Sequence, residues 1–309
     1  MAELPSNIVG FPASIRRSSL TIYDPIQIGD PKLWIPAPEL QELLDSKLAG
    51  MSLAGLALRT RSKVVKQRIC ELLGYPVPKS FKRTQPRFPG QCFDTYIQKS
   101  NNLQIWNEEL SSIRRYVLIR VSDADTITRV KVVTGDALAP LDTTGTLTQK
   151  HQARCIPSAH TAELVSSQDT EPIRPFVSTK ANLSRAIGPT EHPTSRKLLP
   201  ISSVFKKLKK LIGKSFVDTG RDQERNRGAA LHRLCCESLG YQNYLDDGQF
   251  PDIRHQLIEI KLQTAATIDL GLVCPDSTEP LDVPQIQNTQ ILHRDVRYAV
   301  FYEKPMATR

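Results

Sequence analysis

The chain of 309 residues lacks several features that would place it in a specialised class of protein. No apolar run reaches the length of a membrane span, and the start at Met1 has neither the basic residues nor the apolar stretch of a signal peptide. We therefore expect a cytoplasmic protein without a membrane partner. The hydrophobic content of 39% is ordinary for a globular protein, so a core can form.

Common metal-binding patterns of cysteine and histidine are also missing. The six cysteines include no Cys-x-x-Cys pair, and the six histidines show no spacing such as His-Glu-x-x-His. The sequence therefore offers no zinc motif and predicts reduced, mostly structural thiols. We expect His232 and His255 to be structural as well.

Charge is abundant, and its distribution is uneven. The formal net charge is +9, and residues 51–100 hold ten Lys or Arg against only Glu71 and Asp94. Residues 206–214 add five lysines without an acid, whereas residues 251–309 carry six basic and eight acidic residues. A polyanion is a natural partner for the first two regions, although a solubilising charged surface explains the same pattern. The acidic C-terminal region suits a bound cation.

Two helices are predicted near the N-terminus. Leucines at 40, 43, 44 and 48 mark one face of a helix over 39–48, and a second helix runs from about 61 to 73 and stops at Gly74. The second helix has a basic outward face, formed by Arg61, Lys63, Lys66 and Arg68. Such a pair resembles a helix-turn-helix reader of the major groove, but any helical hairpin gives this pattern.

A proline-rich loop at 76–91 follows the second helix and interleaves basic and aromatic residues. Its cations Lys79, Lys82 and Arg83 are expected to grip phosphates. Because Arg pairs with guanine and Gln with adenine, the residues expected to reach base edges are Gln85, Arg87 and Gln91. The alternative is an ordinary basic surface loop.

Successive strands are predicted after this loop, over 93–97, 103–106, 116–121 and 127–133, with a hairpin turn at 99–102. Earlier in the chain, 22–24 and 26–28 are possible short strands. Residues 1–148 are therefore predicted to be an α+β DNA-recognition domain with a basic face.

The character of the chain changes at about residue 149. Residues 149–200 are rich in Ser, Thr and Pro without sustained periodicity, which predicts a linker or a partly ordered arm. A helix over 204–216 follows, with lysines on its polar face. Binding to a membrane surface is one interpretation of this helix; packing onto the next domain, with lysines near DNA, fits its position better. Residues 201–309 are predicted to form a separate catalytic domain.

The organising stretch of that domain is Gln249–Gln263, which is predicted to form two short strands with Asp252 at the bend. A helix over 222–239 precedes it and ends at Gly240. On the second strand Glu259 and Lys261 are two residues apart, so their side chains leave the same face. Further strands are predicted over 267–273 and 296–302, and Asp269 is a minor candidate for the site.

These residue types suit hydrolysis of a phosphodiester. Carboxylates are the ligands that magnesium prefers, and the ion polarises a phosphoryl oxygen and lowers the pKa of an attacking water. A lysine at the same site holds that water or offsets charge in the transition state. The alternative for Glu259 and Lys261 alone is an exposed ion pair on a solvated sheet.

Pro251-Asp252, a gap of six residues, and Glu259-Ile260-Lys261 resemble the signature of the PD-(D/E)XK nuclease superfamily. The resemblance covers about residues 219–303 and implies an α/β core with a mixed central sheet flanked by helices. It also implies a Mg²⁺ site formed by Asp252, Glu259 and the carbonyl of Ile260, with Lys261 orienting the attacking water. The preceding helix would lend Glu224 or Glu237, and Gln263 would position the lysine or touch the DNA backbone.

Together these observations predict a type II restriction endonuclease that hydrolyses duplex DNA at a specific sequence and leaves 5′-phosphates. A homodimer is expected, because both strands of the duplex must be cut. Alternatives are a DNA repair nuclease or a junction resolvase on the same fold, or a DNA-binding regulator without enzymatic activity.

Overall fold

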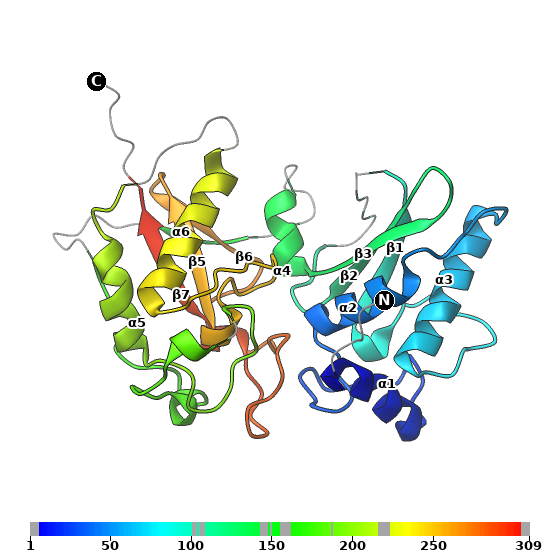
Figure 1. The fold of residues 1–309 in the computed structure, drawn as a ribbon, viewed down its shortest axis with the longest axis horizontal. Helices are drawn as coiled ribbons and strands as arrows, with labels where there is room; N and C mark the ends of the chain where they lie inside the picture. Colours follow the sequence, from blue (N-terminus) through cyan, green and yellow to red (C-terminus); the bar gives the residue numbers. More distant parts are fainter. Residues whose placement is uncertain are drawn as a thin grey trace. The chain divides into compact units, whose positions relative to one another are not determined.

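A computed structural model describes residues 6–100, 103, 105, 109–142, 148, 150–154, 162–186, 188–215 and 223–303. The fold is mixed α/β, with small sheets packed against helices (Figure 1). The chain forms two compact units: unit 1 is residues 1–148 with 280–284, and unit 2 is residues 149–279 with 285–309. None of the helices in the described ranges is long and apolar enough to cross a membrane.

Unit 1 combines helices with a three-stranded sheet of order β1-β2-β3. Strands β1 and β2 are parallel, with Phe93 opposite Arg115, whereas β3 runs antiparallel to β2. The elements of unit 1 are α1 (Ser6–Ser18), α2 (Ala37–Leu48), α3 (Leu58–Leu73), η1 (Pro89–Gln91), β1 (Phe93–Gln98), β2 (Arg115–Val121), β3 (Ile127–Thr134), α4 (Gly135–Leu138) and η2 (Ala139–Leu141).

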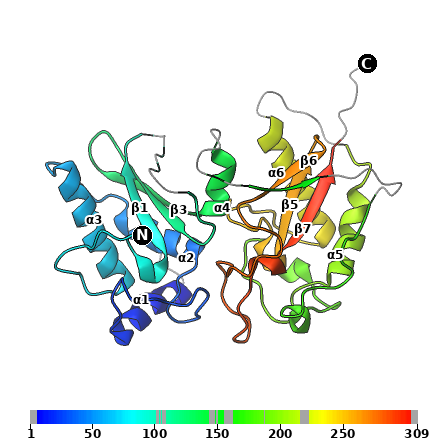
Figure 2. The ribbon, with the colours of Figure 1, turned by 180° about the vertical axis from the view of Figure 1, so that it is seen from behind.

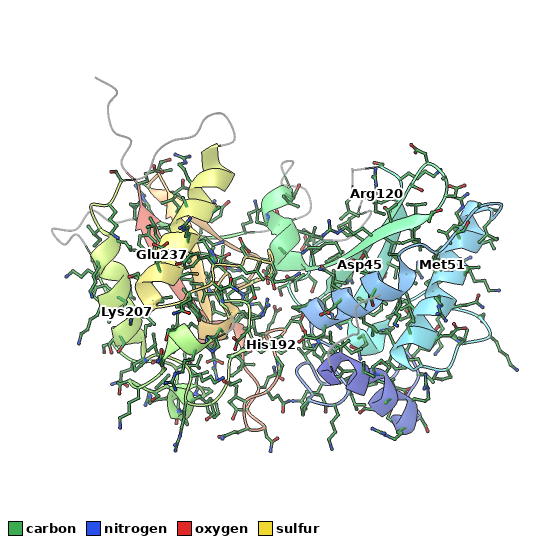
Figure 3. All side chains as sticks on the ribbon, viewed as in Figure 1. Asp45, Met51, Arg120, His192, Lys207 and Glu237 are labelled. Carbon is green, nitrogen blue, oxygen red and sulfur yellow. The ribbon has the colours of Figure 1, made fainter. Side chains whose placement is uncertain are left out.

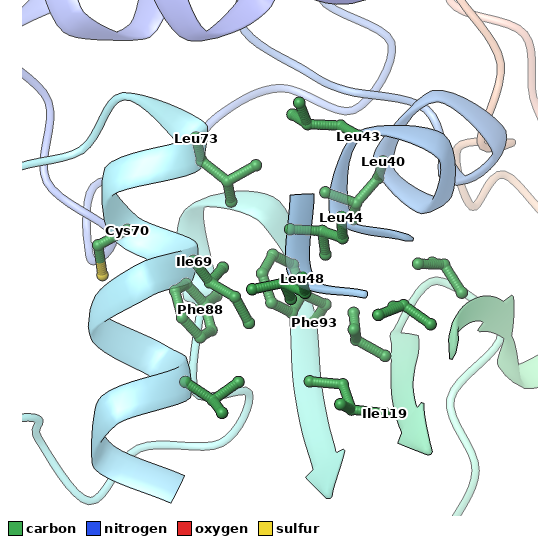
Figure 4. Close-up of a cluster of buried hydrophobic side chains, with 14 of the residues drawn as sticks. Leu40, Leu43, Leu44, Leu48, Ile69, Cys70, Leu73, Phe88, Phe93 and Ile119 are labelled. Carbon is green, nitrogen blue, oxygen red and sulfur yellow. The ribbon is translucent and has the colours of Figure 1, made fainter. Parts of the chain in front are cut away.

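The core of unit 1 lies between helices α2 and α3 and the sheet. Figure 4 shows Leu44 and Leu48 of α2 and Ile69 of α3 directed toward Phe88, which precedes β1, and Phe93, the first residue of β1. Helix α3 ends at Gly74, whose φ of 86° lies in the left-handed region that glycine tolerates best. A side chain there would also collide with the carbonyl of Pro12, so both the turn and the packing require glycine.

Unit 2 contains two small sheets, one formed by β5 and β7 and the other by β4 and β6. Strands β5 and β7 are parallel, with Ile258 opposite Arg297, and β4 runs antiparallel to β6. The elements of unit 2 are β4 (His151–Arg154), η3 (Arg174–Phe176), η4 (Leu183–Arg185), α5 (Ile201–Leu208), η5 (Lys209–Leu211), α6 (Gln223–Leu239), η6 (Arg254–Gln256), β5 (Ile258–Gln263), β6 (Thr267–Gly271), η7 (His293–Asp295) and β7 (Arg297–Tyr302).

Helix α6 packs on β5 and on α5 to form the core of unit 2. Figure 2 shows the pair β5 and β7 from the side away from these helices. Buried Leu231, Cys235 and Leu239 of α6 meet Ile258 at the start of β5. The core therefore anchors the first residue of the strand that carries Glu259 and Lys261.

The predicted helices over 39–48 and 61–73 are confirmed, as are the strands over 93–97, 116–121 and 127–133. The helix predicted over 222–239 is α6, described from residue 223, and the strands predicted over 267–273 and 296–302 are the shorter β6 (267–271) and β7 (297–302). The short strands considered over 22–24 and 26–28 are wrong, because these residues form turns and irregular chain after helix α1. The helix predicted to reach 216 ends at Leu208 and is followed by the short 3-10 helix η5. The sequence of helix α1 gives no clear helical signal, because it contains Pro12. Half of the residues over 99–106, where a turn and a strand were predicted, lie outside the described ranges, and the neighbour of β1 is the parallel β2.

The linker predicted over 149–200 needs correction where the structure describes it. This segment belongs to unit 2 and places Ile173, Phe176, Leu198 and Leu199 in buried positions. Its apolar residues are too widely spaced to give a periodic signal, because they anchor short turns and not a regular helix or strand.

Candidate active site

A tight turn precedes β5 and positions Asp252. The backbone groups of Ile253 and Ile258 pair across it, η6 fills the interval, and Leu257 adopts a left-handed φ of 53°. Residues 249–257 are therefore a turn, and the first of the two strands predicted within Gln249–Gln263 is wrong. The turn folds Asp252 back against the beginning of β5.

The carboxylates of Asp252 and Glu259 meet through this turn. The backbone N–H of Asp252 donates to Oε2 of Glu259 at 3.1 Å, and the N–H of Ile260 donates to Oδ2 of Asp252 at 2.8 Å. Each carboxylate thus binds the backbone beside the other. Glu259 is buried, with 6% of its surface exposed, while Asp252 keeps partial exposure.

Lys261 joins the carboxylates from the same face of β5. Its Nζ lies 2.7 Å from Oε1 of Glu259. The lysine is less than one quarter exposed, so this ion pair is not the solvated surface pair that the tripeptide alone permits. Two acids and one amine therefore form one compact cluster.

The electrostatics of the cluster favour an added positive charge. Burial of the Asp252 carboxyl raises its pKa well above the ordinary value, and the negative charge of Glu259 raises it further. The N–H of Ile260 and the ammonium of Lys261 oppose this rise. Two close carboxylates share a proton or a cation more readily than they both remain ionised without one.

The donor set fits a magnesium ion, since it offers two carboxylates from a rigid turn and strand. Asp252 and Glu259 would hold the ion, with the carbonyl of Ile260 as the further predicted ligand. Within the described ranges, no group of three or more acidic, cysteine or histidine side chains is arranged to hold a metal, so the remaining ligands would be water and substrate oxygens.

The acidic ligand predicted from α6 was Glu224 or Glu237. The side chain of Glu224 lies outside the described residues. Glu237 is exposed on α6 and binds Arg233 at 3.0 Å (Figure 3). Gln263 is also directed elsewhere: its side-chain oxygen accepts from the N–H of Thr264 at 2.9 Å and so caps the turn after β5.

Residues that the sequence did not single out hold the turn in place. The side chain of Gln256 binds the carbonyl of Lys197 and the N–H of Leu199, both at 2.8 Å. Buried Arg297 donates to the carbonyl of Gln256 at 3.1 Å and pairs with Asp169 at 2.7 Å. These contacts span 41 to 128 positions along the chain, so no local pattern reveals them.

Tyr241 and His255 form a second buried support. The tyrosine hydroxyl lies 2.7 Å from Nδ1 of His255, and the N–H of His255 donates to the carbonyl of Pro189 at 2.9 Å. Burial lowers the pKa of His255 below its usual value. The geometry agrees with a structural role for His255. His232 is buried as well, with its ring within 4 Å of Sγ of Cys236.

The carboxylate of Asp269, the minor candidate, makes its contacts outside the cluster. On β6 its carboxylate accepts from Nε2 of Gln152 at 2.7 Å and lies 3.8 Å from Nζ of Lys150. It therefore supports the pairing of β4 with β6.

The DNA-binding residues predicted in unit 1 separate into three groups. Exposed side chains are those of Lys63, Arg68, Lys79, Lys82, Arg83 and Gln85. Lys66 and Arg87 are partly buried. The other two are structural: Arg61 binds both carboxylate oxygens of Asp125, at 2.6 and 2.7 Å, and Gln91 is buried.

Gln91 corrects the prediction of a base-reading role. Only 1% of its surface is exposed, and its side chain binds the carbonyl of Leu33 at 2.6 Å and the N–H of Ile35 at 3.2 Å. Helix α2 packs along β3 of the sheet and also contacts α3. The exposed cations of 63–85 still form a basic surface.

Comparisons of the chain with models of protein families, with curated protein sequences and with solved structures give no significant match.

Proposed function

We propose that unit 2 is a magnesium-dependent DNA endonuclease with the core of the PD-(D/E)XK superfamily. One observation carries the proposal: the turn before β5 brings the carboxylates of Asp252 and Glu259 together, with the Lys261 amine 2.7 Å from Glu259. The order helix α6, turn, β5, β6 and parallel β7 supports the same core.

In this proposal Asp252 and Glu259 would hold the cation at the scissile phosphodiester. The bound ion would polarise a phosphoryl oxygen and lower the pKa of a water. Lys261 orients that water toward phosphorus through its ammonium N–H groups. The water oxygen loses a proton to solvent and forms the new bond to phosphorus, the bond to the 3′ oxygen breaks, and that oxygen takes a proton from solvent, which leaves a 5′-phosphate.

The basic surface of unit 1 supports duplex DNA as the substrate. Exposed Lys63, Lys79, Lys82 and Arg83 lie in a segment with a large excess of cations. Phosphate contacts of this kind release condensed counterions and dominate affinity for DNA. A module that binds DNA beside a catalytic unit suits a type II restriction endonuclease acting as a homodimer, the specific form of the proposal.

Incubation of the protein with supercoiled plasmid tests the function. We expect discrete linear fragments in Mg²⁺ and none in EDTA. Asp252→Ala and Lys261→Ala should each abolish cleavage, because one removes a metal ligand and the other the group that orients water; a misplacement of the reacting atoms by about 1 Å alone costs about 10²-fold.

Asp269→Asn provides the matched control, since it alters a carboxylate of the same unit that binds Lys150 and Gln152. It should cut like the wild type. Cleavage by Asp252→Ala, or cleavage by the wild type that persists in EDTA, would contradict the assigned site. Nicked or degraded plasmid in place of discrete fragments would indicate a repair nuclease, and a mobility shift without cleavage a DNA-binding regulator.

A further inference from the structure

The turn before β1 in unit 1 has the same backbone as the turn before β5 in unit 2. Phe88 pairs with Phe93 across η1 as Ile253 pairs with Ile258 across η6. The entering residues have φ and ψ of −118° and 76° in unit 1 and −109° and 76° in unit 2. The closing residues, Cys92 and Leu257, are both left-handed, with φ of 47° and 53°.

The side chains that hold the two turns also correspond. In both units a glutamine lies two residues before the strand, Gln91 before β1 and Gln256 before β5. Its side chain binds one carbonyl and one N–H of the segment that precedes helix α2 or α5. That segment ends at a proline, and the next residue starts α2 or α5.

A buried arginine and an aspartate complete the shared framework. Arg115 is the first residue of β2, which runs parallel to β1, and Arg297 is the first residue of β7, which runs parallel to β5. Each arginine donates to the backbone carbonyl of the glutamine in the turn, Gln91 or Gln256. Their acidic partners come from different parts of the chain, Asp282 for unit 1 and Asp169 for unit 2. Each acid also accepts from the first N–H of the helix, at 3.1 Å for α2 and 3.0 Å for α5.

The helix before each turn ends in nearly the same sequence. Cys70-Glu-Leu-Leu-Gly-Tyr75 in unit 1 and Cys236-Glu-Ser-Leu-Gly-Tyr241 in unit 2 differ at one of six positions. In both, the tyrosine N–H bonds to the cysteine carbonyl, at 2.9 and 3.0 Å, and the glycine has a positive φ. Unit 1 and unit 2 therefore share one structural plan.

Matching the turns places different chemistry at the position of the active site. Arg87 stands where unit 2 has Asp252, Asp94 where it has Glu259, and Tyr96 where it has Lys261. The N–H of Arg87 donates to Oδ1 of Asp94 at 2.8 Å, as the N–H of Asp252 donates to Glu259 at 3.1 Å. One of the two carboxylates has thus become a guanidinium, and the cation-binding pair is lost.

Two further cations lie near this turn. Arg114 lies 3.7 Å from Oδ2 of Asp94, and Lys66 of α3 rests over the ring of Phe81, 4.9 Å from its centre. Burial lowers the pKa of Lys66, and the positive charge of nearby Arg87 lowers it further. Three cations against one carboxylate favour an anion where unit 2 favours a cation.

We propose that the Arg87 site, formed by Arg87, Lys66 and Arg114, is a non-catalytic counterpart of the active site and binds a phosphodiester group of duplex DNA. The choice of DNA as the polymer rests on the function proposed above. The framework that presents the scissile phosphate to carboxylates in unit 2 presents a phosphate to a guanidinium in unit 1. Each chain then carries one cutting site and one binding site.

Fluorescence anisotropy with a labelled duplex of 30 base pairs in EDTA tests the site. We expect Arg87→Ala to weaken binding by on the order of tenfold, about 1.4 kcal/mol. Loss of one phosphate contact should reduce the slope of log affinity against log salt by about 0.9. Lys66→Ala should act in the same direction.

Arg120→Ala is the matched control, because Arg120 is an exposed cation of β2 in the same unit (Figure 3). Equal affinity and salt slope for Arg87→Ala and Arg120→Ala would overturn the inference, as would a wild type that binds no duplex. Circular dichroism verifies that each variant is folded. A wild type that binds through Arg87 but does not cut in Mg²⁺ would refute the proposed nuclease and leave this site standing.

Discussion

The turns before β1 and β5 have nearly the same backbone and the same supporting contacts, yet they present opposite charge. In unit 2 the turn places Asp252 beside Glu259, and in unit 1 it places Arg87 beside Asp94. The comparison separates framework from chemistry: glutamine, arginine and aspartate fix the turn, and the residues it presents decide between binding a cation and binding an anion.

The largest expected effect comes from breaking the framework itself. Arg297→Met leaves the buried carboxylate of Asp169 without its cation, and Arg115→Met removes the arginine that donates to the carbonyls of Ile35 and Gln91. Removing one member of a buried ion pair costs about 3–5 kcal/mol, so each variant should lose a large share of its stability. Hydrogen exchange followed by mass spectrometry gives the loss separately for β1 and β5.

A control in the same strand is Tyr302→Ser, since Tyr302 is exposed at the end of β7. Tyr302→Ser should change hydrogen exchange at β5 only slightly. If β5 were as well protected from hydrogen exchange in Arg297→Met as in the wild type, the arginine would not be part of the framework.

The turn glutamines should have the next largest effect. Gln91→Leu and Gln256→Leu each leave one carbonyl and one N–H without their bonds. A buried polar group without a partner costs about 1–3 kcal/mol, so we expect a comparable loss in both units. Urea unfolding measures it, with tryptophan fluorescence reporting on unit 1, which contains both tryptophans. A loss in only one of the two variants would break the comparison.

The glycines that end α3 and α6 sharpen the comparison because their surroundings differ. A left-handed alanine costs about 1–2 kcal/mol. A Cβ on Gly240 meets open space, whereas a Cβ on Gly74 would lie 2.2 Å from the carbonyl oxygen of Pro12. Gly74→Ala should therefore destabilise the protein more than Gly240→Ala in thermal melts. Equal changes in melting temperature would show that α1 moves away from the new Cβ without a loss of stability.

The smallest expected effect is a difference in response to acid. All six histidines lie in residues 149–309, and burial lowers the pKa of His293 to about 4. The unfolded state binds this proton near pH 6.5, so stability that is present above that pH is lost as the pH falls toward 4. We expect unit 2 to lose protection from hydrogen exchange before unit 1 between pH 6.5 and 4. His293→Asn should reduce the difference, and an unchanged difference would refute the role of His293.

The sequence predicted the elements whose signals are local. Leucines 40 to 48 gave α2, Gly74 and Gly240 marked the ends of α3 and α6, and the alternation of 258–263 gave β5. The same alternation placed Glu259 and Lys261 on one face. The helices and strands beside the candidate site were therefore predictable.

What the sequence did not reveal depends on contacts between distant segments. Asp282 supports unit 1 from position 282, while Asp169 supports unit 2 from a segment predicted as a linker. The role of Gln91 depends on Leu33 and Ile35, more than 50 positions away, so composition suggested a base reader instead. One signal for the shared plan was present, since Cys-Glu-x-Leu-Gly-Tyr occurs at both 70 and 236.

Single-turnover cleavage of a duplex at increasing protein concentration tests the central claim, the division of labour between Arg87 and Lys261, most directly. For Lys261→Ala we predict wild-type affinity with a saturated rate at least about 10²-fold lower. For Arg87→Ala we predict weaker binding with the saturated rate retained. A saturated rate lost in Arg87→Ala, or retained in Lys261→Ala, would contradict the account.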